Sequence, residues 1–372
     1  MKKVGAYVHI PFCEKKCYYC DFKAFANLEG WIGGYVENLI KEISLYRQRI
    51  DVSIDSLYIG GGTPSYINPK YIETIVGEIN KFDHALREFT IEANPKSIDR
   101  QKLKIYKDLG VTRISLGVQS FDDRVLKNIG RNHNKKIALK DIDLIREFGF
   151  DLSFDLMLNL PGQDFSSVKK DLDLVKDLRP DHISWYSLIL DKGSRFYALD
   201  QKGKLDLMDD DLEVDIFTYL IGRLKDFGLS RYEISNFARK GYESIHNQKY
   251  WDNEGYLGLG LASSGFLSNV RYTNVDNFII YGKMLEKGKL PIKSREFIST
   301  KEREKEYVIF KLRKREGINL EEFKNKFGKD FLIAYKKVLR KFKGQNFYNI
   351  GDNFYFTDKG MSLSNEFFLE II

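Results

Sequence analysis

The sequence is poor in cysteine, in proline and in long hydrophobic runs, and each shortage excludes a class of protein. Three cysteines in 372 residues are too few for a disulfide scaffold. Seven prolines and 43% hydrophobic residues argue against a disordered chain. No stretch approaches 18 consecutive apolar residues, so no transmembrane segment is expected. Residues 1–10 lack the apolar core of a secretory signal, and we therefore expect a cytoplasmic protein.

The positive charge is concentrated towards the C-terminus. The net charge is +7, and residues 301–343 hold fifteen Lys and Arg against seven Asp and Glu. A basic segment on a nearly neutral body predicts a separate small domain. Two interpretations stay open, a solvated helical surface and a nucleic-acid patch, and the first is favoured.

Short apolar strands alternate with amphipathic helices through the first two thirds of the chain. The predicted strands are residues 4–12, 56–59, 88–93, 113–118, 152–160, 182–190 and 231–234. The predicted helices are residues 30–47, 68–82, 100–109, 136–148, 166–178 and 210–227. Six or seven such units predict an α/β fold with a full or partial (β/α) TIM-like barrel, and the partial form is our choice.

The pattern changes after about residue 295. A capping box of Ser299 and Glu302 starts a predicted helix over residues 300–313, and helices at 320–327 and 331–342 follow. Residues 347–350 and 354–356 then form a predicted hairpin. Three helices and a two-stranded wing are typical of a winged-helix domain. The predicted division is a barrel at residues 1–235, a connecting segment at 236–295 and a winged-helix-like domain at 296–372.

All three cysteines, Cys13, Cys17 and Cys20, lie on one loop after the first predicted strand. Three thiolates bind soft metal centres, and structural zinc would need a fourth ligand, for which His9 is the nearby candidate. A 4Fe–4S cluster held by three cysteines would leave one iron open to a small molecule.

The C-x3-C-x2-C spacing, with the aromatic Tyr19 before the last cysteine, resembles the motif of the radical S-adenosylmethionine (SAM) superfamily. In that superfamily SAM chelates the open iron, and an electron from the cluster can cleave it to a 5′-deoxyadenosyl radical. The resemblance therefore implies a 4Fe–4S cluster and SAM as cofactors.

Polar residues and glycines recur where the predicted strands end, which is the ligand-binding mouth of a barrel. Together they resemble the family of oxygen-independent coproporphyrinogen III dehydrogenase and its relatives, from Tyr7 to about Phe266. By this resemblance the SAM pocket is lined by Tyr7, Tyr19, Gly61, Gly62, Thr63, Glu92, Gln119, Arg131 and Asp155.

Two departures from the dehydrogenase point to the haem chaperone branch of that family. Phe22 stands where the dehydrogenase has a further cysteine, and only twelve residues precede Cys13. Residues 246–251 read His-Asn-Gln-Lys-Tyr-Trp and resemble the H-N-x-x-Y-W motif of that branch. The resemblance implies haem binding and delivery to an unidentified acceptor protein, with His246 as the haem contact. The other interpretation of this motif is a capped turn with Tyr250 and Trp251 in the core.

Other functions stay open at this point. A radical SAM enzyme acting on a tetrapyrrole shares the cluster motif, and a winged-helix nucleic-acid-binding regulator would explain the basic C-terminal region. The branch usually has a histidine near Ser264 that this sequence lacks. The family also allows a homodimer.

Overall fold

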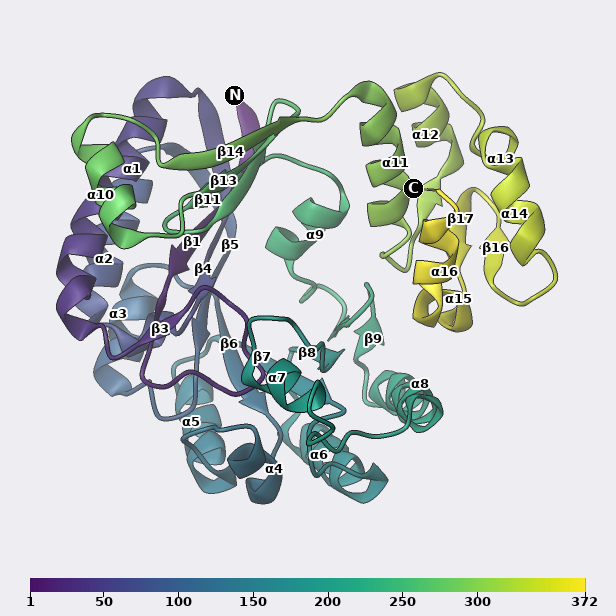
Figure 1. Ribbon diagram of the computed structural model, residues 1–372, viewed down its shortest axis with the longest axis horizontal. Helices are drawn as coiled ribbons and strands as arrows, with labels where there is room; N and C mark the ends of the chain where they lie inside the picture. The colour runs from purple at the N-terminus through teal and green to yellow at the C-terminus, as the bar shows by residue number, and fades with distance from the viewer. Residues whose placement is uncertain (372) are drawn as a thin grey trace.

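The computed structural model describes residues 1–371, and one twelve-stranded sheet organises most of them (Figure 1). Six strands that follow one another along the chain pair in parallel, which confirms the partial (β/α) barrel. They are β1 (Lys2–Ile10), β4 (Val52–Gly61), β5 (Asp83–Ala93), β6 (Arg113–Gln119), β7 (Asp151–Leu158) and β8 (His182–Ser187).

Helices join these strands, and their apolar stripes pack against the sheet. The set comprises η1 (Glu29–Trp31), α1 (Ile32–Arg49), η2 (Pro64–Tyr66), α2 (Pro69–Ile79), α3 (Arg100–Asp108), α4 (Asp123–Asn128), α5 (Lys135–Glu147), α6 (Phe165–Leu178), α7 (Arg195–Asp200) and α8 (Asp210–Asp226). Asn and Asp side chains cap the N-termini of α2, α3, α4, α5, α6 and α8, which explains where these helices begin. The short helices α4 and α7 were not predicted, because six residues give too little periodicity.

The segment after residue 235, predicted to be a connecting segment, adds strands to the main sheet. It contains β10 (Asn236–Ala238), α9 (Ile245–Trp251), β11 (Tyr256–Leu259), β12 (Ser264–Leu267), β13 (Val270–Asn274), α10 (Phe278–Glu286) and β14 (Ile292–Phe297). Strand β11 pairs in parallel with β1, and β12, β13 and β14 continue the same sheet antiparallel. The division at residues 235 and 295 stays a prediction.

The strand predicted at residues 231–234 is wrong in extent. Strand β9 (Ser230–Arg231) ends early because the chain turns back into β10, which pairs antiparallel with β8 as well as with β9. The Tyr232 N–H bonds the Asn236 carbonyl across this turn.

A second hydrophobic core, rich in phenylalanine, lies in the C-terminal part. Its elements are α11 (Thr300–Lys311), β15 (Ile318–Asn319), α12 (Leu320–Phe327), α13 (Phe331–Ala334), α14 (Lys336–Phe342), β16 (Tyr348–Ile350), β17 (Asn353–Phe356), α15 (Asp358–Ser362) and α16 (Ser364–Leu369). The capping box of Ser299 and Glu302 is present. The helix predicted over residues 331–342 is two helices, because the backbone leaves helical geometry at Tyr335.

The two parts meet where α9 packs beside α11 (Figure 1). Asp252, at the end of α9, accepts ion pairs from Lys311 at 2.7 Å and Lys314 at 3.0 Å. The rings of Trp251 and Phe310 lie edge to face, 6.3 Å between centroids. Within residues 1–371, no helix combines the length and apolar character needed to span a membrane.

Candidate functional site

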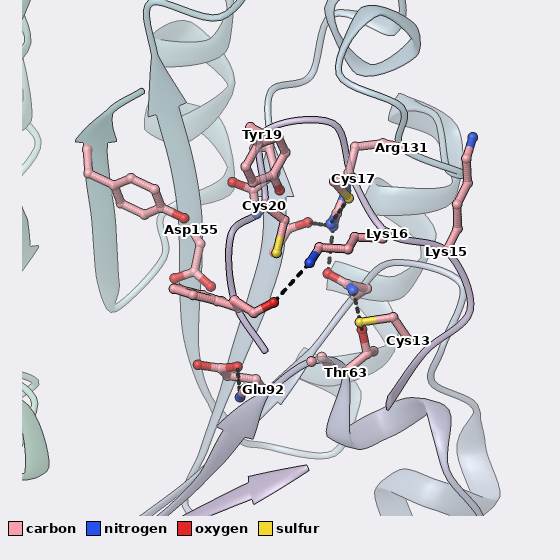
Figure 2. A pocket seen from close by; sticks show the side chains of 18 residues that line it. Cys13, Lys15, Lys16, Cys17, Tyr19, Cys20, Thr63, Glu92, Arg131 and Asp155 are labelled. Carbon is pink, nitrogen blue, oxygen red and sulfur yellow. Dashed lines mark hydrogen bonds between the residues drawn. The ribbon is translucent and has the colours of Figure 1, made fainter. Parts of the chain in front are cut away.

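The three cysteines line one side of a pocket at the carboxyl end of the parallel strands (Figure 2). The loop that carries them leaves β1, forms the short strand β2 (Phe12–Cys13) and returns through β3 (Phe25–Ala26), which pairs with β2. Each cysteine is half-buried and none forms a disulfide. The geometry thus brings together three thiols that are 4 and 3 residues apart in the sequence.

The pocket has a volume of about 130 Å³. Eight of the nine residues assigned to a SAM pocket by resemblance line it with the cysteines, namely Tyr19, Gly61, Gly62, Thr63, Glu92, Gln119, Arg131 and Asp155. The ninth, Tyr7, does not line this pocket and faces a second one described below. The convergence follows from the fold, because the carboxyl ends of parallel strands meet at one edge of the sheet.

The cysteine sulfurs already have polar neighbours suited to thiolates. The Thr63 hydroxyl lies 3.5 Å from Cys13 Sγ, and Arg131 Nη1 lies 3.5 Å from Cys17 Sγ. Among residues 1–371, no three His, Cys, Asp or Glu side chains gather closely enough to hold a single metal ion. His9 is not a fourth ligand, because its ring nitrogens bond the Tyr7 hydroxyl at 2.9 Å and the Lys23 carbonyl at 3.0 Å.

Burial favours the protonated form of the Cys13 and Cys20 thiols while no metal is bound. It raises the pKa of Cys13, and it raises the pKa of Cys20 to about 11. Iron ligation requires thiolates, so cluster assembly must displace these protons. The donor set fits a 4Fe–4S cluster, since three sulfurs and the cationic guanidinium of Arg131 line one pocket.

The positions beside the cysteines require glycine, because neighbouring atoms lie too close to leave room for a Cβ. A Cβ on Gly62 would lie 2.7 Å from the Phe12 carbonyl oxygen, on the strand that carries Cys13. Gly61 has φ +113°, and a Cβ there would collide with the His9 ring. Only glycine therefore lets the end of β4 lie against the cysteine loop.

Two half-buried carboxylates form the opposite wall. Burial, and then the nearby charge of Asp155, raise the pKa of Glu92 to about 7. The Tyr58 hydroxyl donates to Glu92 at 2.8 Å, and the Gly61 N–H donates to its other oxygen at 3.0 Å. Burial also raises the pKa of Asp155, which accepts from the Ser115 hydroxyl at 3.0 Å. Both carboxyl groups can therefore pair with a positively charged group of a ligand.

Arg131 and Gln119 complete the floor of the pocket. Arg131 donates to the Gly117 carbonyl and, at 2.6 Å, to Asn94 Oδ1, which fixes its guanidinium beside Cys17. Its Nε has no partner, although it is buried. Gln119 has φ +68° and a buried Oε1 without a partner. Strained backbone and unpaired buried atoms are features of ligand sites.

A second cavity, of about 510 Å³, lies between α9, the strands β11 to β13 and α11. It is lined by Tyr7, Tyr250, Trp251, Asn253, Glu254, Tyr256, Ser264, Phe266, Arg271 and Phe310. Six of these ten residues are aromatic. The volume falls in the range of roughly 300–1,000 Å³ typical of small-molecule sites.

His246 is buried behind this cavity and does not line it. Its Nδ1 lies 3.0 Å from the Ser56 hydroxyl and its Nε2 lies 2.8 Å from the Tyr250 hydroxyl. Burial, and then the charge of Lys249, lower the pKa of His246 to about 3, so the ring is neutral. The residue singled out by the motif therefore reaches the cavity through Tyr250.

Sequence reasoning missed several residues of the two pockets. Asn94 and Tyr186 line the cysteine pocket, and Tyr58 links the two pockets, since its hydroxyl donates to Glu92 and its ring stacks on Tyr7 with centroids 6.1 Å apart. Asn94 follows Glu92 at the end of β5, so the rule that found Glu92 could have found it. Tyr58 and Tyr186 lie within strands, where an aromatic residue is normally interpreted as part of the hydrophobic core.

Comparisons with known proteins agree with this architecture. The model of the Radical SAM superfamily matches residues 7–175, and that of the HemN C-terminal domain matches residues 298–363. A solved structure of coproporphyrinogen III oxidase (HemN) from Escherichia coli, described as a radical SAM enzyme, superposes with a TM-score of 0.88 at 22% identity, covering 100% of this chain and 90% of that one. Fold and site thus define a radical SAM protein, and this class implies a 4Fe–4S cluster and SAM as cofactors.

Two curated relatives match nearly end to end. The chain is 36% identical to the heme chaperone HemW of Lactococcus lactis subsp. lactis (strain IL1403), covering 99% of this chain and 97% of that protein. It is 34% identical to the heme chaperone HemW of Bacillus subtilis (strain 168), covering 98% of each. The chain belongs to the family of HemW heme chaperones.

Proposed function

We propose that this protein binds haem in the cavity between α9 and α11 and delivers it to an acceptor protein. The observation that carries the proposal is the cavity itself, large and aromatic, beside the family's H-N-x-x-Y-W helix. Flat macrocycles pack well on aromatic rings. Haem binding is the property named in the curated relatives.

The polar groups of the cavity suit the edge of a porphyrin. Haem carries two propionate groups, which need hydrogen-bond donors or cations. The Trp251 Nε1 and Asn253 Nδ2 donors are buried and have no partner. Arg271 also lines the cavity and is 31% exposed, although Glu306 accepts from it at 3.0 Å. Two unpaired donors and an accessible guanidinium therefore favour a ligand with carboxylates.

The cysteine pocket holds the cofactors in this proposal. Cys13, Cys17 and Cys20 bind the 4Fe–4S cluster, which supplies an open iron for SAM. Arg131 pairs with the methionyl carboxylate of SAM, and the glycines at the end of β4 accommodate its methionyl amine. Glu92 and Asp155 face its positive charge and its ribose hydroxyls. Tyr7 does not line this pocket; it stacks on Tyr58 with centroids 6.1 Å apart, and the Tyr58 hydroxyl donates to Glu92.

The cellular setting is part of the proposal. A cluster with an open iron, held by cysteines that form no disulfide, requires a reducing compartment, and we propose the cytoplasm. The acceptor is a haem-requiring protein. Since the bound haem would face the space between the two parts of the chain, we propose that transfer takes place at that opening, in a monomer or in a homodimer.

The test is anaerobic reconstitution with iron and sulfide followed by haem titration. We expect one haem per chain, retained through gel filtration and passed to an apo-haemoprotein. Trp251→Ala, which removes a wall of the cavity, should weaken binding at least tenfold, whereas Trp31→Ala, which packs on Phe278 and does not line the cavity, should leave it unchanged. Haem binding that is weak, multiple and equal in both variants would contradict the proposal.

The same preparation separates a chaperone from a radical enzyme. With SAM, a reductant and haem or coproporphyrinogen, the chaperone returns the tetrapyrrole unaltered. Stoichiometric 5′-deoxyadenosine with a modified tetrapyrrole would show that the cavity is an active site.

A further inference from the structure

The side chain that reaches haem iron in this cavity cannot be read from the motif alone. His246 lies behind the cavity wall, with both ring nitrogens occupied by side-chain partners. The residues that line the cavity include no histidine, cysteine or methionine. An iron ligand from the wall must therefore be an oxygen donor, and tyrosine is the oxygen donor that proteins use for haem.

Three tyrosines line the cavity, and their hydroxyls differ in environment. The Tyr7 hydroxyl meets His9 Nδ1, and His9 Nε2 is committed as a donor to the Lys23 carbonyl. His9 Nδ1 must then be the acceptor, so Tyr7 has to keep its proton. The Tyr256 ring packs edge to face on Tyr250, 4.6 Å between centroids.

Tyr250 is in a different position, because its partner can become a donor. His246 Nδ1 faces the Ser56 hydroxyl, which can donate to it. In that tautomer His246 Nε2 carries the ring proton and points it at the Tyr250 oxygen, 2.8 Å away. A phenolate at Tyr250 would thus keep a hydrogen-bond donor, as an anion in a partly buried site requires.

The structure holds His246 in this place. Its ring stacks on Tyr58, 5.4 Å between centroids at 29°. A Cβ on Gly5 would lie 3.1 Å from His246 Cε1 and 3.0 Å from the Ser56 hydroxyl oxygen, so β1 carries a glycine where the pair needs room. The Glu88 carboxylate accepts from the Ile245 N–H at 2.6 Å and fixes the start of α9. Swinging His246 into the cavity would break these contacts.

We propose that the phenolate oxygen of Tyr250 ligates the iron of ferric haem and that His246 acts as a positioning residue behind it. This inference rests on the proposed function. An iron–oxygen bond forms, the phenolic O–H bond breaks, its proton leaves to water, and the iron stays ferric. A phenolate is a hard anionic ligand and prefers ferric to ferrous iron, so reduction weakens the bond.

Resonance Raman and electron paramagnetic resonance spectra of the haem-loaded protein test the ligand. We expect high-spin ferric iron with iron–phenolate vibrations in the wild type, and loss of these vibrations with at least a tenfold weaker affinity in Tyr250→Phe. Tyr256→Phe, a matched change in the same cavity, should keep them. His246→Ala should keep the phenolate signature but release haem faster, and dithionite should lower the affinity of the wild type.

Two results would overturn the inference. One is a phenolate signature that persists in Tyr250→Phe. The other is a wild-type spectrum of imidazole-ligated iron that disappears in His246→Ala. The wild-type spectrum alone distinguishes phenolate from imidazole, so the test does not depend on either variant folding. Failure of the wild type to bind haem stoichiometrically would instead count against the proposed function.

Discussion

Glu92 should set the pH dependence of SAM binding in the cysteine pocket. Its pKa stands at about 7 in place of the ordinary 4.5, because burial and the charge of Asp155 oppose ionisation. The Tyr58 hydroxyl and the Gly61 N–H offset this only in part. The rise from 4.5 to about 7 corresponds to roughly 3 kcal/mol of destabilisation of the ionised form.

SAM carries a sulfonium and an ammonium group, so it binds best when Glu92 is ionised. Below pH 7 the ligand must also displace a proton from this carboxyl. The contribution of Glu92 therefore lowers the affinity about tenfold for each pH unit between roughly pH 7 and pH 5. Above pH 7 this contribution is constant.

Equilibrium dialysis of labelled SAM against the reconstituted protein, at several pH values from 5.5 to 7.5, measures this effect. Glu92→Gln cannot ionise, so its affinity should depend on pH less steeply by about one proton. Proton loss from the methionyl amine affects both proteins equally, and the difference between the slopes isolates Glu92. Glu14→Gln, on the cysteine loop but outside the pocket, is the matched control. Parallel slopes for the wild type and Glu92→Gln would refute the reasoning.

Four further outcomes are expected. Cys17→Ala should abolish bound iron and acid-labile sulfide with an unchanged far-ultraviolet circular dichroism spectrum, because the sheet does not depend on it; retained sulfide would contradict the assignment. Glu88→Ala leaves Arg113 buried without its partner at 3.5 Å and should cost about 3–5 kcal/mol in urea unfolding, whereas the exposed Glu37→Ala should cost under about 0.5 kcal/mol. Burial raises the pKa of Glu42 to about 7, so the folded state binds a proton that the unfolded state releases; stability should fall by about 3 kcal/mol as pH rises from about 4.5 to 7, and equal slopes in Glu42→Gln would count against this. Phe310→Ala should weaken haem binding about five- to tenfold through the lost ring, measured by titration, with the exposed Ile333→Ala as the neutral comparison.

Local patterns in the sequence were enough to predict the barrel. Each strand-to-helix unit is contiguous, and apolar runs ending in glycine or a polar residue mark the mouth of the barrel. For that reason Glu92, Gln119 and Asp155 could be grouped from the sequence alone. Strands β11 and β12 were missed because they are four residues long and contain glycine, which weakens any strand pattern.

The second cavity could not have been predicted from local patterns. Its walls come from Tyr7 on the first strand, Tyr250 on α9 and Phe310 on α11, which are more than 50 residues apart at each step. The place of His246 behind Tyr250 is likewise a matter of packing, since a helical turn fixes spacing but not which side chain faces the cavity. The motif identified the helix, and tertiary contacts assign the roles within it.

Phe310 has a consequence for release, because it makes the C-terminal domain one wall of the cavity. A ligand bound in this cavity contacts both α9 and α11 and stabilises their packing, next to the ion pairs of Asp252 with Lys311 and Lys314. By thermodynamic reciprocity, a partner that separates α9 from α11 weakens ligand binding. The loss equals the free energy by which the ligand stabilises the contact between these two helices. An acceptor that competes with Asp252 for Lys311 and Lys314 would therefore weaken haem binding without contacting the haem.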